Sequence, residues 1–419
     1  MTVKAPAILK RSPLRLGFIP LMDAALLFVA AEQRLFQKHG LEVELSPEPS
    51  WANIRDKVAL GALDGAHMLA TMPLAATLGI GNIRKAQVTA FVLNLNGNAI
   101  TVANHVAERM EAADAPACAG RINSARALKK VIDQDKAQGK APLTFAVTFP
   151  FSTHNYELRY WMASAGIDPD RDVRLVVVPP HRMFENLASG SIDGYCVGDP
   201  WNQQSVLVGL GRIAVTTYEL WNNRAEKVFA VNQDWADRNH STHVALLMAL
   251  LEAAQWIDRP ENRLEAATFL ARPEYVGASF EVLKLPLLGN VLYQSGSLPE
   301  SSPDHIVFHR YAANFPWRSQ AEWWLQQMRR WGHLDAGTDI NAAADAVYRT
   351  DIYREAARGL DLPYPTIDRK PEGIHAGQWL MAAATGPIAM GPDAAFDGAT
   401  FPATDSVPAQ PAAKRDAIA

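Results

Sequence analysis

Cysteine is scarce in this sequence, and the motifs that cysteine and histidine form in metal sites are missing. The 419 residues include two cysteines, Cys118 and Cys196, which are too few for a disulfide framework. No Cys-x-x-Cys or His-Glu-x-x-His pattern occurs, so the sequence has no strong metal signature. We therefore predict neither a cofactor nor a metal site.

Positive charge is not concentrated anywhere either. Lys and Arg total 40 against 44 Asp and Glu, which gives a formal net charge of −4 without a basic block. This balance argues against nonspecific nucleic-acid binding as the main activity. Because 48 % of the residues are hydrophobic, the chain can bury a large core in two or three domains.

A long, unbroken apolar run is missing as well. The stretch "LGFIPLMDAALLFVAA" follows several basic residues and resembles a secretion signal, but Pro20 and Asp23 interrupt it. An ionised aspartate inside a short apolar core is costly, and the stretch equally fits a first strand and helix. Residues 65–83 and 86–107 lack Asp, Glu, Lys and Arg, yet they contain polar residues typical of buried strands and loops. We predict no membrane span and a cytoplasmic location.

One phrase occurs twice in the chain. "GALDGAHM" occupies residues 61–68 and "GSIDGYCV" occupies residues 190–197. An apolar pair spaced by four residues precedes each copy in the same register, at 54–58 and at 183–187. Each copy therefore predicts a helix, a glycine stop and a buried strand, and the pair predicts two similar lobes. The alternative is that Gly-x-x-Asp-Gly is merely a common helix-to-strand connection.

Strand and helix patterns alternate along most of the chain. In the first hundred residues they predict strands at 16–19, 41–46 and 64–68 and helices at 24–38 and 51–60. Such alternation predicts an α/β fold with mostly parallel sheets and helices on both faces.

Five segments follow from these patterns. They are a leader at 1–12, the first part of lobe I at 13–99, lobe II at 100–202, the return of lobe I with C-terminal helices at 203–389, and a tail at 390–419. The tail is rich in Ala, Pro, Asp and Gly without a period, which predicts disorder.

Several hydrogen-bond donors follow the predicted strands, where ligands of two-lobed α/β proteins bind. They are Trp51, Asn98, His154, the backbone of Gly198, and Lys227. Indole, amide, imidazole, backbone N–H and ammonium groups together suit a small anion. Each also has a structural alternative, because Trp51 can lie in the core, His154 at a helix start, Gly198 in a turn and Lys227 on the surface, just before a strand.

Four longer phrases favour the binding-site interpretation: "SWANIRDKVALGALDGAHMLATMP", "TFPFSTHNYELRYWMASAGIDPDRDVRLVVVPPHRM", "SGSIDGYCVGDPWN" and "LLMALLEAAQWID". Together they resemble the nitrate-binding family of solute-binding proteins, which includes the nitrate and bicarbonate receptors of cyanobacterial ABC uptake systems. The resemblance covers about residues 14–385. It implies a two-lobe, periplasmic-binding-protein-like fold (type II, C-clamp), with mixed sheets and a cleft between the lobes.

The same resemblance implies which residues contact the ligand. The anion ligands of the family match Trp51, His154, the backbone at Val197 and Gly198, and Lys227, whereas Leu21 resembles an apolar wall position. Asn98 departs from the family, which has a glutamine on this bridging strand.

Nitrate is the ligand that the sequence favours. Nitrate only accepts hydrogen bonds, whereas bicarbonate also donates one and would gain from a carboxylate acceptor or a bound cation. The bridging residue is the neutral Asn98, and the proposed set contains no obvious carboxylate. We therefore predict nitrate, with nitrite as a second ligand.

Three functions fit these observations. Because neither an export signal nor a cysteine before Cys118 is evident, the first is a NasS-type cytoplasmic nitrate/nitrite sensor. Such a sensor controls an RNA-binding antiterminator of the response-regulator type for nitrate assimilation, and itself contacts neither nucleic acid nor membrane. The alternative is the solute-binding component of a nitrate or bicarbonate ABC transporter, with a permease and an ATPase as partners.

The third function is an enzyme like those of the thiamine-pyrimidine branch of this fold. That branch needs a reactive arrangement of cysteine and histidine. Cys196 lies inside the apolar strand "YCV", which predicts a core position. We therefore predict that the protein is not an enzyme.

Overall fold

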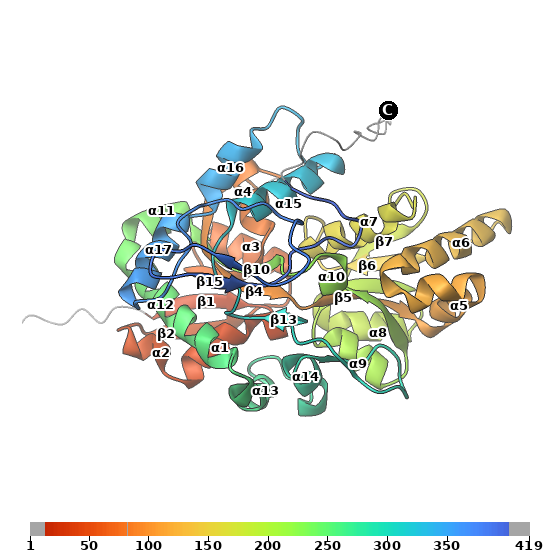
Figure 1. Ribbon diagram of the computed structural model, residues 1–419, viewed down its shortest axis with the longest axis horizontal. Helices are drawn as coiled ribbons and strands as arrows, with labels where there is room; N and C mark the ends of the chain where they lie inside the picture. Colours follow the sequence, from red (N-terminus) through yellow and green to blue (C-terminus); the bar gives the residue numbers. More distant parts are fainter. Residues whose placement is uncertain (1–12, 82, 402–419) are drawn as a thin grey trace, which may run out of the picture.

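Two β-sheets organise the chain, one in each half of the molecule (Figure 1). The computed structural model describes residues 13–81 and 83–401, so the predicted leader at 1–12 and residues 402–419 of the predicted tail lie outside it. The first sheet has the strand order β13-β4-β10-β3-β1-β2. It consists of β1 (Leu14–Phe18), β2 (Val43–Pro47), β3 (Gly65–Leu69), β4 (Gln87–Asn96), β10 (Ala225–Asn232) and β13 (Ile306–Val307).

The second sheet has the strand order β7-β6-β8-β5-β9. It consists of β5 (Asn98–Ala103), β6 (Thr144–Val147), β7 (Arg174–Val177), β8 (Gly194–Gly198) and β9 (Gly211–Thr216). At one edge, each sheet has three parallel strands, which are β2-β1-β3 in the first sheet and β7-β6-β8 in the second. The strands that follow toward the other edge pair antiparallel. Both sheets are therefore mixed, as the family resemblance implied, whereas the mostly parallel sheets predicted from the alternation of strands and helices are not found.

The repeated phrase occupies the same place in both lobes. Helix α3 (Trp51–Ala59) precedes β3, and helix α8 (Met183–Ala188) precedes β8. Gly61 and Gly190 follow these helices with φ values of 73° and 69°, in the left-handed region that favours glycine. Because β3 and β8 are the third strand of their respective parallel sets, the prediction of two similar lobes is confirmed.

Helices cover both sheets. Those of the first lobe are α1 (Ala25–Glu32), α2 (Leu35–Lys38), α3, α4 (Met72–Leu78), α11 (Gln233–Arg238), α12 (His240–Ile257), α13 (Arg263–Leu270), α14 (Phe280–Leu287), α15 (Arg318–Arg330), α16 (Ile340–Val347) and α17 (Thr350–Gly359). Those of the second lobe are α5 (Asn104–Ala119), α6 (Ser124–Ala137), α7 (Thr153–Ser164), α8, α9 (Trp201–Leu207) and α10 (Thr217–Leu220). There are also two short antiparallel ribbons. One pairs β11 (Asn290–Val291) with β12 (Glu300–Ser301), and the other pairs β14 (Trp379–Met381) with β15 (Ile388–Met390).

The return to the first lobe comes later than residue 203. Strand β9 pairs antiparallel with β5 and forms the edge of the second sheet, so this sheet extends to Thr216. The chain re-enters the first sheet only with β10. The expected boundary at 202 was wrong because α9 and β9 have no counterpart in the repeated phrase that defined the lobe.

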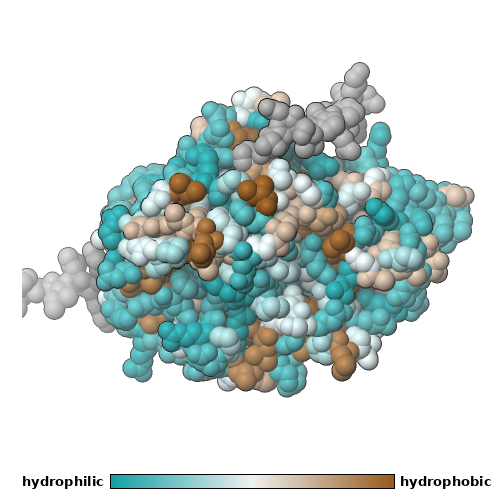
Figure 2. Space-filling view, in the orientation of Figure 1, coloured by the Kyte–Doolittle hydropathy of each residue, from teal (hydrophilic) through white to brown (hydrophobic). Residues whose placement is uncertain are grey.

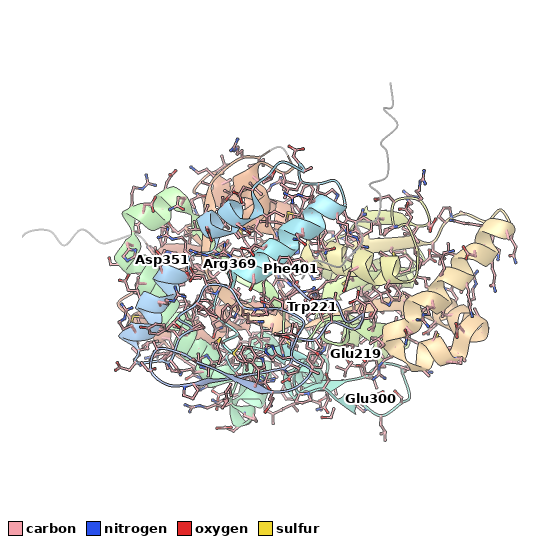
Figure 3. The ribbon with its side chains drawn as sticks, turned by 45° about the horizontal axis from the view of Figure 1, so that its top comes forward. Glu219, Trp221, Glu300, Asp351, Arg369 and Phe401 are labelled. Carbon is pink, nitrogen blue, oxygen red and sulfur yellow. The ribbon has the colours of Figure 1, made fainter. Side chains whose placement is uncertain are left out.

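The segment from 390 to 401 is packed against the molecule, which corrects the predicted start of a disordered tail. Asn222 donates its N–H to the carbonyl of Ala394 at 3.0 Å, and Phe396 donates to Leu220 at 2.9 Å. Phe401 is buried and belongs to the same apolar cluster as Trp221 (Figure 3). A composition rich in Ala and Pro did not reveal these few apolar anchors.

The core has one large apolar cluster on each side of the first sheet and one in the second lobe. Cys196 is fully buried in the second-lobe cluster, as its apolar neighbours predicted. The face shown in Figure 2 is mostly hydrophilic, with separate apolar spots. Among the described helices, none has the length and apolarity that crossing a membrane requires.

Candidate functional site

Lys227 lies inside β10, where the sequence had suggested a position just before a strand. Its backbone pairs with Leu69 of β3 and Asn94 of β4, and its side chain has no exposed surface. The ammonium lies 2.7 Å from Asp23 Oδ2 and 2.6 Å from Glu226 Oε1. Burial alone would lower the pKa of Lys227, but the two carboxylates outweigh it and raise that pKa. Lys227 is therefore a buried cation in a charge cluster.

A bulge explains how the neighbours Glu226 and Lys227 meet. Successive side chains of a regular strand point to opposite faces of the sheet. The pairing of β10 with β4 shifts register between Ala225 and Lys227 and again after Lys227. Such an irregularity re-aims side chains, which is how both charges reach the same place.

Asp23 brings a carboxylate to the carboxyl end of β1. It lies in a short 3-10 helix at Met22–Ala24 and is 2 % exposed. Its Oδ1 lies 2.9 Å from Nε2 of His67, a buried residue of β3. Burial raises the pKa of Asp23, but Lys227 and His67 outweigh that effect and lower it well below its usual range. Asp23 is thus ionised at neutral pH, and the prediction of a site without carboxylates was wrong.

Trp51 and His154 lie in the first turns of two helices, one in each lobe. Ser50 caps α3 by accepting the N–H of Asn53 at 3.2 Å, which fixes Trp51 in the first turn. The indole N–H of Trp51 is buried and has no hydrogen-bond partner among the described residues. Lys227 Nζ lies 6.0 Å from the centroid of the Trp51 ring. The indole N–H can therefore serve as a donor for a ligand beside the lysine.

His154 lies in the first turn of α7, which Ser152 caps. Its Nδ1 is 3.0 Å from the hydroxyl oxygen of Thr148, and its Nε2 is 3.7 Å from Glu226 Oε1. Burial and then Lys227 lower the pKa of His154 to about 3, so the ring is neutral near pH 7. When Thr148 donates to Nδ1, the ring proton sits on Nε2, which has no hydrogen-bond partner in the described part of the chain.

Asn98 and Gly198 face each other across β5 and β8. Asn98 donates its Nδ2 to Glu157 Oε2 at 2.9 Å, and its Oδ1 lacks a hydrogen-bond partner among residues 13–81 and 83–401. A Cβ on Gly198 would lie 3.1 Å from Asp23 Oδ2, 3.2 Å from Asn98 Oδ1 and 3.7 Å from Leu21 Cδ2. A glycine at this position lets the second lobe approach the first closely.

The structure thus places the predicted residues around one centre between the lobes. Leu21, Trp51 and Lys227 come from the first lobe, and Asn98, His154, Val197 and Gly198 come from the second. The carbonyl of Val197 accepts from Asn202 Nδ2 at 2.8 Å. As ligand contacts these seven residues stay predictions.

Five charged or titratable residues of the centre escaped the sequence reasoning: Asp23, His67, Glu157, Arg224 and Glu226. Arg224 is 5 % exposed and donates to Glu157 Oε1 at 2.8 Å, which joins the two lobes. Its guanidinium carbon also lies 4.2 Å and 4.4 Å from the ring centroids of Trp323 and Trp324. Asp23 had been noticed only as an interruption of an apolar run. Of the others, Glu226 adjoins Lys227, Glu157 lies on helix α7, His67 lies inside strand β3, and Arg224 directly precedes β10.

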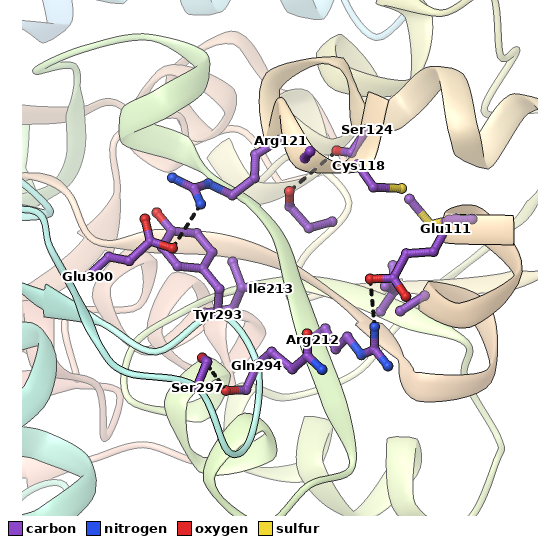
Figure 4. A pocket seen from close by; sticks show the side chains of 15 residues that line it. Glu111, Cys118, Arg121, Ser124, Arg212, Ile213, Tyr293, Gln294, Ser297 and Glu300 are labelled. Atoms are coloured by element: carbon purple, nitrogen blue, oxygen red, sulfur yellow. Dashed lines mark hydrogen bonds and ion pairs between the residues drawn. The ribbon is translucent and has the colours of Figure 1, made fainter. Parts of the chain in front are cut away.

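A cavity of about 260 Å³, lined by none of these residues, lies beside the edge strand β9 (Figure 4). Its two cations already have anionic partners. Arg121 contacts Glu219 at 2.7 Å and Glu300 at 3.1 Å, and Arg212 contacts Glu111 at 2.8 Å. The interlobe centre, where Trp51 Nε1 and His154 Nε2 have no hydrogen-bond partner among the described residues, is the better candidate for an anion.

Two lobes of matching strand pattern, with buried polar groups converging between them, define a solute-binding protein of the periplasmic-binding-protein type. The family profile described as "NMT1-like family" matches residues 9–271. The chain belongs to this family, and within it to the nitrate-binding NrtA-type solute-binding proteins.

Curated relatives carry names from anion import. The chain is 38 % identical over 354 residues to the nitrate/nitrite binding protein NrtA of Synechococcus elongatus, covering 82 % of this chain and 77 % of that protein. It is 31 % identical over 387 residues to the bicarbonate-binding protein CmpA of the same organism, covering 87 % and 82 %. It is 40 % identical over 357 residues to the nitrate import ATP-binding protein NrtC of Synechocystis sp., covering 85 % of this chain. The matched region covers 51 % of NrtC, so the chain spans about half the length of that protein.

The crystal structure of the periplasmic nitrate-binding protein NrtA from Synechocystis has the same fold. The two structures superpose with a TM-score of 0.80 at 32 % identity, over 93 % of this chain and 95 % of that one. The expected two-lobe fold is thereby confirmed. The relatives named above are binding or import proteins, and none of them is a sensor or an enzyme of pyrimidine synthesis.

Proposed function

We propose that this protein binds nitrate or nitrite between its lobes as the solute-binding component of an ABC import system. The observation that carries the proposal is the buried Lys227, together with Trp51 Nε1 and His154 Nε2, which are buried without a hydrogen-bond partner among the described residues. A cation and two free donors suit an ion that only accepts hydrogen bonds. The identity of 38 % to a nitrate/nitrite binding protein supports the same ligand.

Bicarbonate is the second candidate, because the site contains carboxylates after all. Oε2 of Glu226 and Oδ1 of Asn98 are buried acceptors without a hydrogen-bond partner among the described residues. The O–H of bicarbonate could donate to either oxygen, whereas nitrate could not. Nitrate stays the first choice because Asp23 and Glu226 are both engaged by Lys227, and because the identity to CmpA is lower, at 31 %.

Calorimetry with nitrate, nitrite, bicarbonate and sulfate tests this proposal directly. We expect nitrate and nitrite to bind more tightly than bicarbonate, and sulfate to bind weakly. Tighter binding of bicarbonate would move the protein to bicarbonate import, and no binding of any of the four anions would refute the anion site.

The importer proposal replaces the sensor as the main function. Relatives of this chain include ATP-binding proteins for nitrate import and for bicarbonate transport, which support an ABC permease and ATPase as partners. An antiterminator partner has no comparable support.

The cytoplasmic location stays a separate prediction. It conflicts with a role in import, because an import receptor works outside the cytoplasmic membrane. Cell fractionation, with sequencing of the mature N-terminus, separates the two. Recovery outside the cytoplasm supports the importer. A cytoplasmic protein whose antiterminator partner is released by nitrate would restore the sensor.

A further inference from the structure

Glu157 is a buried carboxylate that reaches the anion site through one other residue. It lies in α7, is 2 % exposed, and uses both oxygens in hydrogen bonds. Oε1 accepts from Arg224 at 2.8 Å, and Oε2 accepts from Asn98 Nδ2 at 2.9 Å. The charge state of Glu157 therefore acts on the amide of Asn98.

The amide of Asn98 turns its acceptor end toward the site. An ionised carboxylate can only accept hydrogen bonds, so an ionised Glu157 holds the NH₂ group of Asn98. The carbonyl Oδ1 is left buried without a partner among the described residues, 3.2 Å from where a Cβ of Gly198 would lie. Nitrate has no hydrogen to offer this oxygen. While Glu157 is ionised, Asn98 presents the wrong end to an anion.

The charges of the cluster oppose an anion as well. Asp23, Glu157 and Glu226 are acids, Arg224 and Lys227 are bases, and both histidines of the centre have lowered pKa values. With all three acids ionised, three negative charges face two positive ones. A bound monoanion would leave a net charge of −2 in a buried site, which is costly unless a proton comes with it.

Glu157 is the group of this cluster that can take a proton near neutral pH. Burial first, and then Glu226, raise the pKa of Glu157 to about 7 against the opposing effects of Arg224 and Asn98. Cys196 of β8 also faces it, but burial raises the pKa of that thiol so far that it stays protonated. Burial raises the pKa of Glu226, but Lys227 outweighs burial and lowers that pKa, and Asn98 contributes to the lowering.

We infer that nitrate binding takes up one proton at Glu157, and that the protonated carboxyl turns Asn98 so that its NH₂ group faces the anion. The inference rests on the proposed function. The new O–H of Glu157 donates to Asn98 Oδ1, and Asn98 Nδ2 donates to a nitrate oxygen; the proton comes from solvent. Glu157 is then a positioning residue, which acts on the ligand only through Asn98.

The proton count of nitrate binding tests the inference. Calorimetric titrations at one pH in two cationic buffers of different protonation enthalpy, with the same counter-anion at the same concentration, give the number of protons taken up. We expect close to one proton per nitrate at pH 8 and close to none at pH 6. The Kd should change little below pH 6.5 and rise by up to about tenfold per pH unit above pH 7.5.

Glu157→Gln separates the positioning role from a purely structural one. A glutamine is neutral and can donate its own NH₂ group to Asn98 Oδ1, so it imitates the protonated acid. We expect the variant to bind nitrate at pH 8 as tightly as the wild type does at pH 6, without proton uptake. The control is Glu372→Gln, which alters a buried acid bonded to Ser319 and Lys370 and should leave the proton count unchanged.

Binding by the wild type at pH 8 without proton uptake would overturn the inference and leave the proposed function standing. Undiminished proton uptake by a folded Glu157→Gln variant would overturn it too. If that variant does not fold, the wild-type proton count still decides. An absence of nitrate and nitrite binding at every pH would refute the proposed function together with the inference.

Discussion

Met22 of the first lobe donates its backbone N–H to the carbonyl of Asp199 of the second lobe at 2.9 Å. Their neighbours in the sequence, Asp23 and Gly198, also lie close together: a Cβ on Gly198 would be 3.1 Å from Asp23 Oδ2. Asp199 is held in turn by His305, with 2.5 Å between Oδ2 and Nε2. The lobes are therefore in contact at the proposed anion site, in a closed arrangement.

Gly198→Ala should disfavour this closed arrangement. The added methyl group would crowd Asp23 Oδ2 and Asn98 Oδ1, at 3.1 Å and 3.2 Å, and overpacking of this kind costs about 1–3 kcal/mol. We expect nitrate to bind about five- to a hundredfold more weakly, and small-angle scattering with nitrate to show a larger radius of gyration than for the wild type.

Gly337→Ala is the matched control for this substitution, since a Cβ there meets no atom within 4 Å. Equal affinity and equal compactness of the Gly198→Ala variant and the wild type would show that the lobes do not close at Gly198.

Lys227→Met should abolish anion binding and also destabilise the protein. A surface position was the alternative that the sequence left open for Lys227, but the structure buries this lysine, and Asp23 and Glu226 would be left buried and uncompensated without it. Breaking a buried ion pair in this way costs about 3–5 kcal/mol. Urea denaturation should show a loss in the free energy of unfolding of that size.

The double variant Asp23→Asn with Lys227→Met removes one of the stranded charges. It should recover part of the stability and none of the nitrate binding. A double variant as unstable as Lys227→Met alone would contradict the role of Asp23 as the partner of the lysine.

The architecture could be predicted from local patterns, whereas the charge cluster could not. The repeated phrase predicted two lobes because helix periodicity, a glycine stop and a buried strand are all local in the chain. The contact between Glu226 and Lys227 depends on a register shift against β4, and the contact of Lys227 with Asp23 joins β10 to a 3-10 helix about two hundred residues earlier in the chain. The packing of Phe401 depends on a tertiary surface that its own segment does not encode.

His154→Phe should weaken nitrate binding with a small effect on stability. Phenylalanine fills the buried position but lacks the Nε2 that has no other hydrogen-bond partner in the described structure. A hydrogen bond to a charged ligand contributes about 1.5–3 kcal/mol, so a loss of about ten- to a hundredfold in affinity is expected. Calorimetry measures it, and an unchanged Kd would remove His154 from the site.

The buried His243 of α12 should make the protein sensitive to acid in a region remote from the site. Neither ring nitrogen has a hydrogen-bond partner among residues 13–81 and 83–401, and the ring packs edge-on against Trp235 with centroids 5.8 Å apart. Burial first, and then His240 and Arg349, lower the pKa of His243 to about 3 from an ordinary value of 6.5.

The unfolded chain therefore binds a proton at His243 between pH 6.5 and pH 3 that the folded protein does not bind. Over this window the free energy of unfolding should fall with decreasing pH, by up to about 1.4 kcal/mol per pH unit for this one group. His243→Leu removes the group and offers a similar apolar volume to the core. Denaturation curves at pH 7 and pH 5 should show a smaller loss of stability for the variant than for the wild type. An equal loss in the two proteins would show that His243 does not stay neutral in the folded state.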